Sequence, residues 1–315
     1  MSPVKLVFCG TPEFAVPTLR AVLDAGHDVA LVLTQPDRPA GRKLELQASA
    51  VKRFALERGL AIDQPERIKN NAELRATLEA IQPDAILVVA YGRIIPHWML
   101  DLPRFGNINL HGSLLPKYRG AAPIQWGIAN GEQETGVTTM KLDAGLDTGD
   151  ILLQHAVPVP PDATAADMYP TLAEIGAKLM LETLAGLDAG TLRSRPQDHE
   201  HATLAPILTR EDGRLDLDRT AGHTYDRWRG FTPWPGCYAE FRGKRFLLLR
   251  IKAAELDLPE PLNPGALIMH HDQLFLAVAQ NTALLLEEVQ LEGKPRMPGA
   301  AFFRDFQIKH GERVG

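Results

Sequence analysis

Asn109 and His111 stand two residues apart at the end of a short apolar run that has the pattern of a β-strand. Side chains at this spacing lie on the same face of a strand. An amide and an imidazole side by side can both donate hydrogen bonds to one oxygen that becomes negative during a reaction. The pair therefore suggests stabilisation of an oxyanion. The alternative is that these are ordinary polar residues at the end of a strand, with no catalytic role.

A third candidate, Asp147, lies in a segment rich in aspartate and glycine, residues 143–150, that follows another predicted strand. In a doubly wound sheet, loops of this kind can converge at the edge where the strands end. Asp147 would then keep His111 protonated and oriented, and would help to remove a proton from an attacking nucleophile. The alternative is turn formation, which we expect for Asp143 and Asp150 because aspartate is common in turns.

Motifs that are missing from the sequence exclude some types of reaction. The sequence has no G-x-S-x-G motif and no cysteine in a catalytic context, so a covalent intermediate on the enzyme is not expected. Three polar groups without a nucleophile suit direct transfer of a group between two bound substrates. A metal site made from the same carboxylates and His111 is disfavoured, because neither an EF-hand spacing nor an H-E-x-x-H motif is present.

Length and composition indicate a two-domain globular protein. The chain has 315 residues, of which 45% are hydrophobic and 23% charged. We expect no signal peptide, because the sequence has no basic region followed by an apolar one of the signal-peptide kind. We expect no membrane span, because no apolar run approaches the roughly 18 residues that a bilayer requires. Cys9 and Cys237 are the only cysteines, which favours a reducing, cytoplasmic location over an oxidising compartment.

The N-terminal part has the pattern of a parallel βαβ unit. An apolar run over 4–10, helical periodicity over 15–25 and a second apolar run over 28–34 follow one another. The first turn lacks the G-x-G-x-x-G spacing, so we expect a Rossmann-like topology without a bound dinucleotide. Further helices are expected over 48–58, 71–81, 121–129 and 164–187, and further strands over 84–90, 106–110, 136–142 and 151–157.

The predicted fold class is therefore α/β, with a Rossmann-like, doubly wound, mainly parallel sheet in a catalytic domain over residues 1–189. A segment with little periodicity, 190–206, is expected to be a linker. Residues 207–315 contain short strands with regular turn signals, including a hairpin around Gly243, which suggest a small β-barrel of the OB type.

A basic segment over residues 35–47 is expected to be a long loop containing Arg38, Arg42 and Lys43 among two prolines and a glycine. Its basic side chains are either simply solvated at the surface, or the segment is an arm that contacts phosphates. The net charge is −5, so a nucleic acid would have to be bound by local basic patches of this kind and not by the overall field.

Residues 109–116 (NLHGSLLP), followed by 143–150 (DAGLDTGD), resemble the paired motifs of the formyltetrahydrofolate-dependent formyltransferases. The resemblance extends over essentially the whole chain, and further segments are similar to the members that act on an aminoacyl-tRNA. These segments are 8–14 (FCGTPEF), 35–43 (QPDRPAGRK), 117–125 (KYRGAAPIQ) and 231–236 (FTPWPG). The resemblance implies transfer of the formyl group of 10-formyltetrahydrofolate to the α-amino group of methionyl initiator tRNA, by a monomer and without a metal.

The resemblance also implies roles for individual residues. Asn109, His111 and Asp147 would form the catalytic triad. Phe14 would lie near the methionyl side chain, and Arg42, with Arg38 and Lys43 beside it, would contact the acceptor end of the tRNA. The C-terminal barrel would contact the tRNA through backbone and shape. The folate co-substrate would be bound by Val89, Ala90, Tyr91, Gly92, Ser113, Leu114, Leu115 and Pro116.

Three alternative functions remain open at this stage. The catalytic motif is compatible with a formyltransferase that acts on a nucleotide-linked amino sugar. A nicotinamide-dependent oxidoreductase would also use a Rossmann-like sheet, although the missing glycine fingerprint argues against it. A non-catalytic RNA-binding module would account for the barrel alone.

Overall fold

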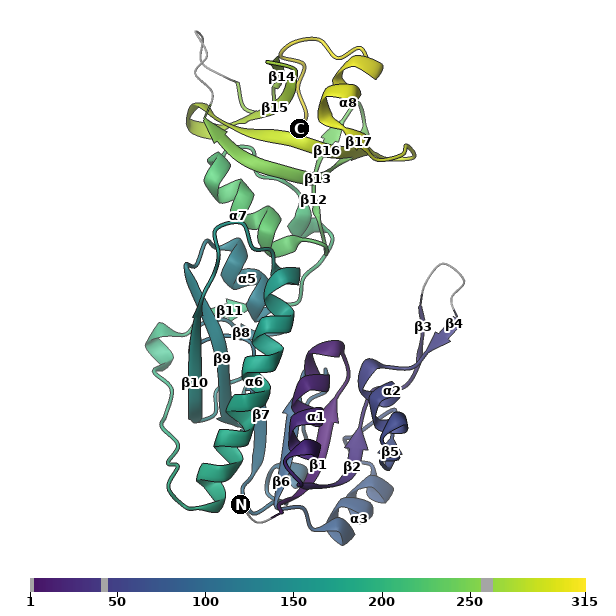
Figure 1. Ribbon diagram of the computed structural model, residues 1–315, viewed down its shortest axis with the longest axis vertical. Helices are drawn as coiled ribbons and strands as arrows, with labels where there is room; N and C mark the ends of the chain where they lie inside the picture. Colours follow the sequence, from purple (N-terminus) through teal and green to yellow (C-terminus); the bar gives the residue numbers. More distant parts are fainter. Residues whose placement is uncertain (1–2, 41–44, 256–262) are drawn as a thin grey trace. The chain divides into compact units, whose positions relative to one another are not determined.

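The computed structural model describes residues 3–40, 45–255 and 263–315, which form two compact units (Figure 1). The first unit comprises Met1–Pro123, Glu134–Pro158 and Met168–Pro206. The second comprises Ile124–Gln133, Val159–Asp167 and Ile207–Gly315. The two units therefore alternate along the chain, and residues 190–206 pack within the first one.

The first unit is built on a seven-stranded mixed sheet. Its order is β10 (Ile151–Pro158), β9 (Glu134–Lys141), β7 (Asn107–His111), β6 (Ala85–Val89), β1 (Lys5–Gly10), β2 (Asp28–Leu33) and β5 (Ile62–Asp63). The strands from β7 to β5 pair in parallel, whereas β9 is antiparallel to both of its neighbours. The central strands are apolar runs buried on both faces, as parallel strands between two layers of helices require.

Helices cover both faces of this sheet. They are η1 (Glu13–Ala15), α1 (Val16–Asp24), α2 (Ala50–Glu57), α3 (Ala72–Ile81), α4 (His97–Leu100) and most of α6 (Ala165–Asp188), and the same unit also contains the short η2 (His199–His201). Ser49 and Asn71 cap α2 and α3, each by accepting a hydrogen bond from a backbone N–H of the first turn. The prediction of a Rossmann-like sheet with helices is confirmed.

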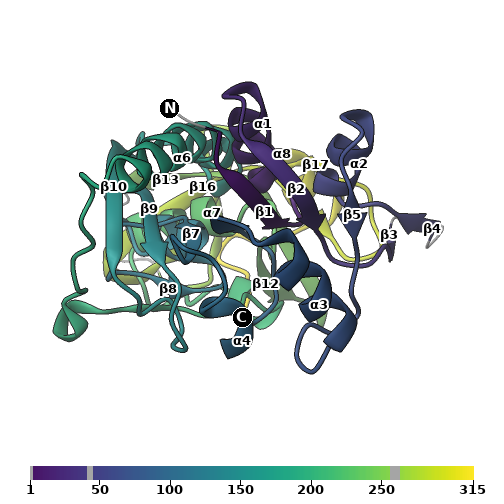
Figure 2. The same ribbon diagram turned by 90° about the horizontal axis from the view of Figure 1, so that it is seen from below.

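The two faces of the sheet differ in what they pack against. Val7 and Cys9 belong to the same buried cluster as Leu74 and Leu78 of α3. On β7, Leu110 lies against Gly176 of α6, close enough that a side chain at this glycine would collide with it. Figure 2 shows α1 and α6 on one side of the strands and α3 and α4 on the other. Because alternate residues face opposite sides, Asn109 and His111 point away from α6.

The basic segment over 35–47 contains two short paired strands, β3 (Arg38–Ala40) and β4 (Glu45–Gln47), so the prediction of a loop throughout is wrong. Strands of three residues are too short to show the alternation by which strands are predicted. Arg42 and Lys43 lie outside the described residues.

The second unit contains an antiparallel sheet and confirms the prediction of a small C-terminal β domain. Its order is β12 (Cys237–Phe241), β13 (Lys244–Glu255), β16 (Thr282–Leu291), β15 (Gln273–Val278) and β14 (Leu267–His270), with β17 (Met297–Pro298) paired to β16. The pairing of β13 with β16 shifts register on either side of Arg250. Such irregularities bend and twist a long strand, which lets the sheet curve around its core.

Helical segments pack against this sheet as well. They are α5 (Pro123–Ala129), η3 (Glu211–Gly213), α7 (Ala221–Phe231), η4 (Ala279–Asn281) and α8 (Gly299–Asp305). The sequence patterns after residue 207 indicated only short β elements and missed α7 and α8. Helix α7 contains glycine, threonine and aromatic residues of modest helix propensity, and tertiary contacts stabilise it. Trp228 is buried there and donates its indole N–H to the carbonyl of Leu248, 2.9 Å away.

Two further short strands, β8 (Arg119–Gly120) and β11 (Leu204–Ala205), pair in parallel within the first unit. Strand β11 belongs to the segment that was expected to be a linker. Within the described parts of the chain, no helix has the length and hydropathy needed to cross a membrane.

The core of the second unit depends on a cluster of aromatic side chains around Phe302. Phe302 is fully buried and lies 4.7 Å from the ring of Phe246 and 5.6 Å from that of Phe241, measured between ring centroids. We expect Phe302→Ala to lower the free energy of unfolding of this unit by about 3–5 kcal/mol, because a buried ring is replaced by a cavity.

Urea denaturation followed by tryptophan fluorescence measures this change. The control is Leu56→Ala at a position 60% exposed in α2, for which a change within about 0.5 kcal/mol is expected. A loss similar to that of the control would contradict the assignment of Phe302 to the centre of this core.

Candidate active site

Strand β7 presents Asn109 and His111 on one face, as their spacing predicts. The strand lies between β6 and β9, with Val88 opposite Asn109 on one side and Thr138 opposite His111 on the other. Both side chains are buried, with exposed fractions of 9% for Asn109 and 5% for His111. Among the described residues, the Asn109 amide has no hydrogen-bond partner, so its two N–H groups remain available to a ligand.

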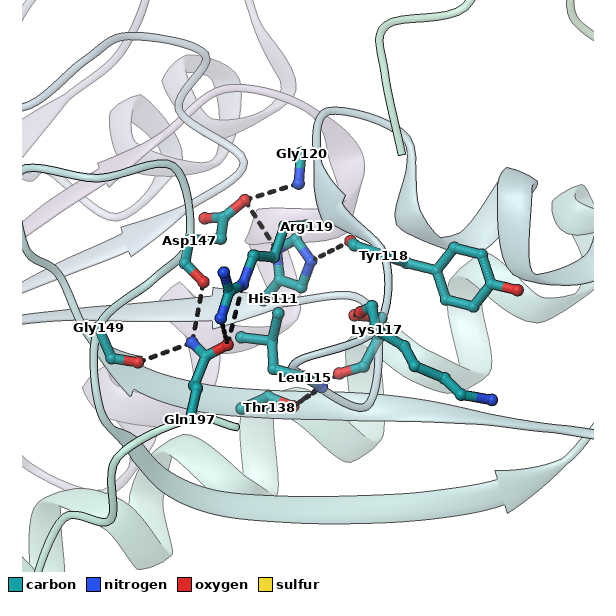
Figure 3. A network of polar contacts seen from close by, with 11 residues as sticks. His111, Leu115, Lys117, Tyr118, Arg119, Gly120, Thr138, Asp147, Gly149 and Gln197 are labelled. Carbon is teal, nitrogen blue, oxygen red and sulfur yellow. Dashed lines mark hydrogen bonds and ion pairs between the residues drawn. The ribbon is translucent and has the colours of Figure 1, made fainter. Parts of the chain in front are cut away.

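Both ring nitrogens of His111 face oxygen atoms of the protein (Figure 3). Its Nε2 lies 2.8 Å from the carbonyl oxygen of Tyr118. Because a carbonyl only accepts hydrogen bonds, Nε2 carries the hydrogen, and Nδ1 is left facing Asp147. The distance from Nδ1 to Asp147 Oδ2 is 3.7 Å, which is an ion-pair distance when Nδ1 is protonated but too long for a hydrogen bond.

Asp147 is oriented by backbone geometry. Its φ is 51°, in the left-handed region, and its Oδ2 accepts a hydrogen bond of 2.8 Å from the backbone N–H of Gly120. Gly120 itself has a φ of 124°, and a Cβ at this position would lie 2.5 Å from the carbonyl oxygen of Ala205. Only glycine fits between strands β8 and β11 here, so the N–H that binds Asp147 depends on the absence of a side chain.

The loop over 143–150 reaches His111 by a longer route than the sequence suggested. Because β9 is antiparallel to β7, Lys141 lies opposite Ile108, and the backbone N–H of Leu142 donates to the carbonyl of Asn107. The loop thus leaves at the beginning of β7, not beyond its carboxyl end, and runs back along the strand. A Cβ at Gly149 would collide with the backbone oxygen of Lys141, so the path of the loop back along the strand also requires glycine at this position.

A second polar network, which the sequence did not indicate, surrounds this loop (Figure 3). Gln197 donates from Nε2 to the carbonyl oxygens of Asp147 and Gly149, at 2.8 and 2.7 Å. Its Oε1 accepts two hydrogen bonds from the guanidinium of Arg119, at 3.0 and 2.7 Å. Arg119 belongs to a segment of the family resemblance, whereas nothing in the sequence distinguishes Gln197 from other polar residues of the expected linker.

In the expected folate segment over 113–116, several polar groups are already bound within the protein. Ser113 Oγ donates to the carbonyl of Lys117 at 2.6 Å, and the Ser113 carbonyl accepts a 2.6 Å bond from Thr138 Oγ1. The carbonyl of Leu115 accepts a hydrogen bond from Gln154. Within this segment, Ser113 and Leu115 are buried, and Leu114 and Pro116 are partly exposed.

The second expected folate segment, 89–92, follows β6. Val89 and Tyr91 are buried, whereas Ala90 and Gly92 are exposed and have left-handed φ values of 47° and 74°. The Tyr91 carbonyl accepts hydrogen bonds from Thr11 Oγ1 at 3.1 Å and from Gln35 Nε2 at 2.9 Å. Burial raises the pKa of the Tyr91 phenol well above its usual value, so this residue is neutral at physiological pH.

The residues expected to contact the acceptor substrate lie in other parts of the first unit. Phe14 in η1 is buried, with its ring edge-on to Tyr169 of α6 at 5.9 Å between centroids. Arg38 is exposed at the start of β3 and donates to Gln35 Oε1 at 3.0 Å. Gln35 in turn contacts the carbonyls of Tyr91 and Gly92, so the base of the hairpin is bound to the 89–92 segment.

The structure therefore brings Asp147 to His111, with Asn109 on the same face of β7 as His111, and adds the backbone of Tyr118 and Gly120 to the group. Among the described residues, no group of histidine, cysteine, aspartate and glutamate side chains has an arrangement that could hold a metal ion.

Two family models match the chain. The model for formyl transferase matches residues 4–184, and the model for the formyl transferase C-terminal domain matches residues 207–307. The methionyl-tRNA formyltransferase of Acidobacterium capsulatum is 59% identical to this chain, over 99% of this chain and 100% of the relative. That of Koribacter versatilis is 56% identical over 98% of each chain.

Two solved structures with the same fold have much lower identity to this chain. The N-formyltransferase from Helicobacter canadensis, solved with folinic acid and dTDP-3-aminofucose, has a TM-score of 0.68 at 17% identity, covering 90% of this chain and 98% of that one. HypX from Aquifex aeolicus, solved with tetrahydrofolic acid, has a TM-score of 0.63 at 18% identity and covers 99% of this chain. This chain spans about half of HypX, 49% of its length.

These structures establish the common fold, and the full-length relatives establish the closer relationship. Both domain models are matched in order, and identity to named relatives reaches 59% over nearly the whole chain. The chain belongs to the formyl transferase family, within the group of methionyl-tRNA formyltransferases.

Proposed function

We propose that this chain transfers the formyl group of 10-formyltetrahydrofolate to the α-amino group of methionyl initiator tRNA, in the cytoplasm and in support of translation initiation. The observation that carries the proposal is the cluster of Asn109, His111 and Asp147 in a member of this family. The named relatives act on methionyl-tRNA, and the related HypX was solved with tetrahydrofolic acid, which supports the choice of both substrates.

The residues present fit a formyl donor. The buried Asn109 amide has N–H groups without a partner among the described residues. The formyl oxygen of the donor is a hydrogen-bond acceptor, so it can bind these N–H groups. The exposed backbone at Ala90 and Gly92 offers polar groups for the edge of a pterin ring. When bound, 10-formyltetrahydrofolate supplies a formyl carbon attached to a nitrogen that can leave.

Asn109 and His111 act on the formyl oxygen. The Asn109 amide donates a hydrogen bond that strengthens as this oxygen becomes negative. Since Nε2 of His111 is bound to the Tyr118 carbonyl, Nδ1 is the atom that remains for the substrate. At 3.7 Å, an N–H on Nδ1 is not committed to Asp147, so it can donate a hydrogen bond to the oxygen while the carboxylate stabilises the imidazolium.

Asp147 also acts on the attacking amine. An α-amino group has a pKa near 8, so a substantial neutral fraction exists at neutral pH and no strong base is needed. Asp147 Oδ2 is bound to Gly120, whereas Oδ1 has no partner among the described residues and can accept a proton from the amine. Asp147 then passes this proton to the departing nitrogen. Proximity of two bound substrates supplies much of the remaining rate enhancement.

The triad can be tested by substitution. We expect Asn109→Ala, His111→Ala and Asp147→Asn each to lower kcat by roughly 10²-fold or more, because each removes stabilisation that is made in the transition state. KM for both substrates should stay within about twofold in steady-state assays. Asp101→Asn, at an exposed position, serves as the control. A rise in KM with unchanged kcat would show that these residues only bind substrate.

The acceptor can be identified by transfer of labelled formyl from 10-formyltetrahydrofolate. We expect labelling of methionyl initiator tRNA and much less labelling of methionine attached to a non-initiator tRNA. A dTDP-linked amino sugar is the comparison substrate, because the H. canadensis structure contains one. Labelling of the sugar nucleotide in preference to the tRNA would refute the proposed acceptor.

The basic segment over 35–47 should contribute to tRNA binding. We expect Arg42→Ala to raise KM for tRNA. The slope of log KM for tRNA against log salt concentration should fall by roughly one, because one phosphate contact is lost. KM for the folate should not change. The matched control is Arg75→Ala, which removes an exposed arginine paired with Glu79 on α3. Equal salt dependence in Arg42→Ala and the control would exclude Arg42 from tRNA binding.

A further inference from the structure

The segment over 194–205 connects the two loops that form the site. Arg195 and Ile151 exchange both of their backbone hydrogen bonds, each 2.9 Å long, next to the end of the 143–150 loop. Further along, Thr203 accepts hydrogen bonds from the backbone N–H groups of Tyr118 and Arg119, both at 2.8 Å. A stretch that the sequence suggested to be a linker is therefore bound to both sides of the His111 and Asp147 pair.

Gln197 lies at the centre of this segment and is 5% exposed. Its orientation is determined, because the Arg119 guanidinium can only donate and therefore requires Oε1. The amide nitrogen must then point to the carbonyls of Asp147 and Gly149. Gln197 is thus the one side chain in Figure 3 that is drawn bonded both to the 143–150 loop and to Arg119.

The loop over 143–150 has few other anchors near the carboxylate. Residues 143–146 are exposed, and Asp143 bonds within the loop, to Gly145 and Thr148. Arg119 is also buried, 7% exposed, and its guanidinium lies 3.0 Å from His199 Nδ1 as well. Removing Gln197 would leave the buried Gly149 carbonyl, the partly buried Asp147 carbonyl and part of a buried guanidinium without these hydrogen bonds, which favours a rearrangement of the loop.

We infer that Gln197 is a positioning residue for formyl transfer. Through two backbone carbonyls it holds the Asp147 carboxylate toward His111, and through Arg119 it holds the segment over 118–120, whose backbone contacts both members of the pair. This inference rests on the proposed function. A displacement of about 1 Å at a reacting group can cost roughly 10²-fold in rate, so a residue that does not touch substrate can still control kcat.

Two substitutions separate the bonds that Gln197 makes. Gln197→Ala removes them all, whereas Gln197→Glu keeps the acceptor for Arg119 and loses both donors to the loop. We expect kcat to fall roughly 10- to 100-fold in both variants, with KM for both substrates within about twofold of wild type. Glu200→Gln, an exposed position in the same segment, is the matched control and should retain wild-type kcat. Wild-type kcat in Gln197→Glu would overturn the inference.

A double-mutant cycle distinguishes positioning from a general structural role. In the Asp147→Ala background the carboxylate is absent, so Gln197→Glu should lower kcat by less than about threefold. If it lowers kcat there by the same factor as in the wild-type background, Gln197 does not act through Asp147 and the inference is wrong. A wild-type enzyme without formyl transfer would refute the proposed function itself, which is a separate outcome.

Discussion

The site depends on the hydrogen bond between His111 Nε2 and the carbonyl oxygen of Tyr118. This bond places the ring hydrogen on Nε2 and leaves Nδ1 as the atom that can gain or donate a proton. Nδ1 faces Asp147 at a distance that permits charge stabilisation without a committed hydrogen bond. The arrangement suits a reaction in which negative charge develops on an oxygen and no enzyme nucleophile is needed.

Backbone groups do much of the positioning around this histidine. The Tyr118 carbonyl and the Gly120 N–H orient His111 and Asp147, and both come from one short segment that pairs with residues 203–205. Gly120 and Gly149 are required because the chain passes too close to other backbone atoms for a side chain. Substitutions at such glycines would move catalytic groups without changing any of them.

The likeness to formyltransferases that act on sugar nucleotides concerns the fold, because identity to those structures is 17–18%. The features that bear on the acceptor lie elsewhere in the chain. Arg38 begins a hairpin whose base is bound to the 89–92 segment through Gln35. With a net charge of −5, the chain has no general attraction for a polyanion, so under the proposed function local groups of this kind would have to supply it.

The sequence alone determined the features that depend on local periodicity and on short motifs. The apolar runs specified a parallel sheet, and the two-residue spacing placed Asn109 and His111 on one face. Only the tertiary structure decided the path of the 143–150 loop, because that path follows from the antiparallel pairing of β9. It also decided the position of Gln197. Contacts between residues 50 positions apart in the chain have no local pattern that a sequence can display.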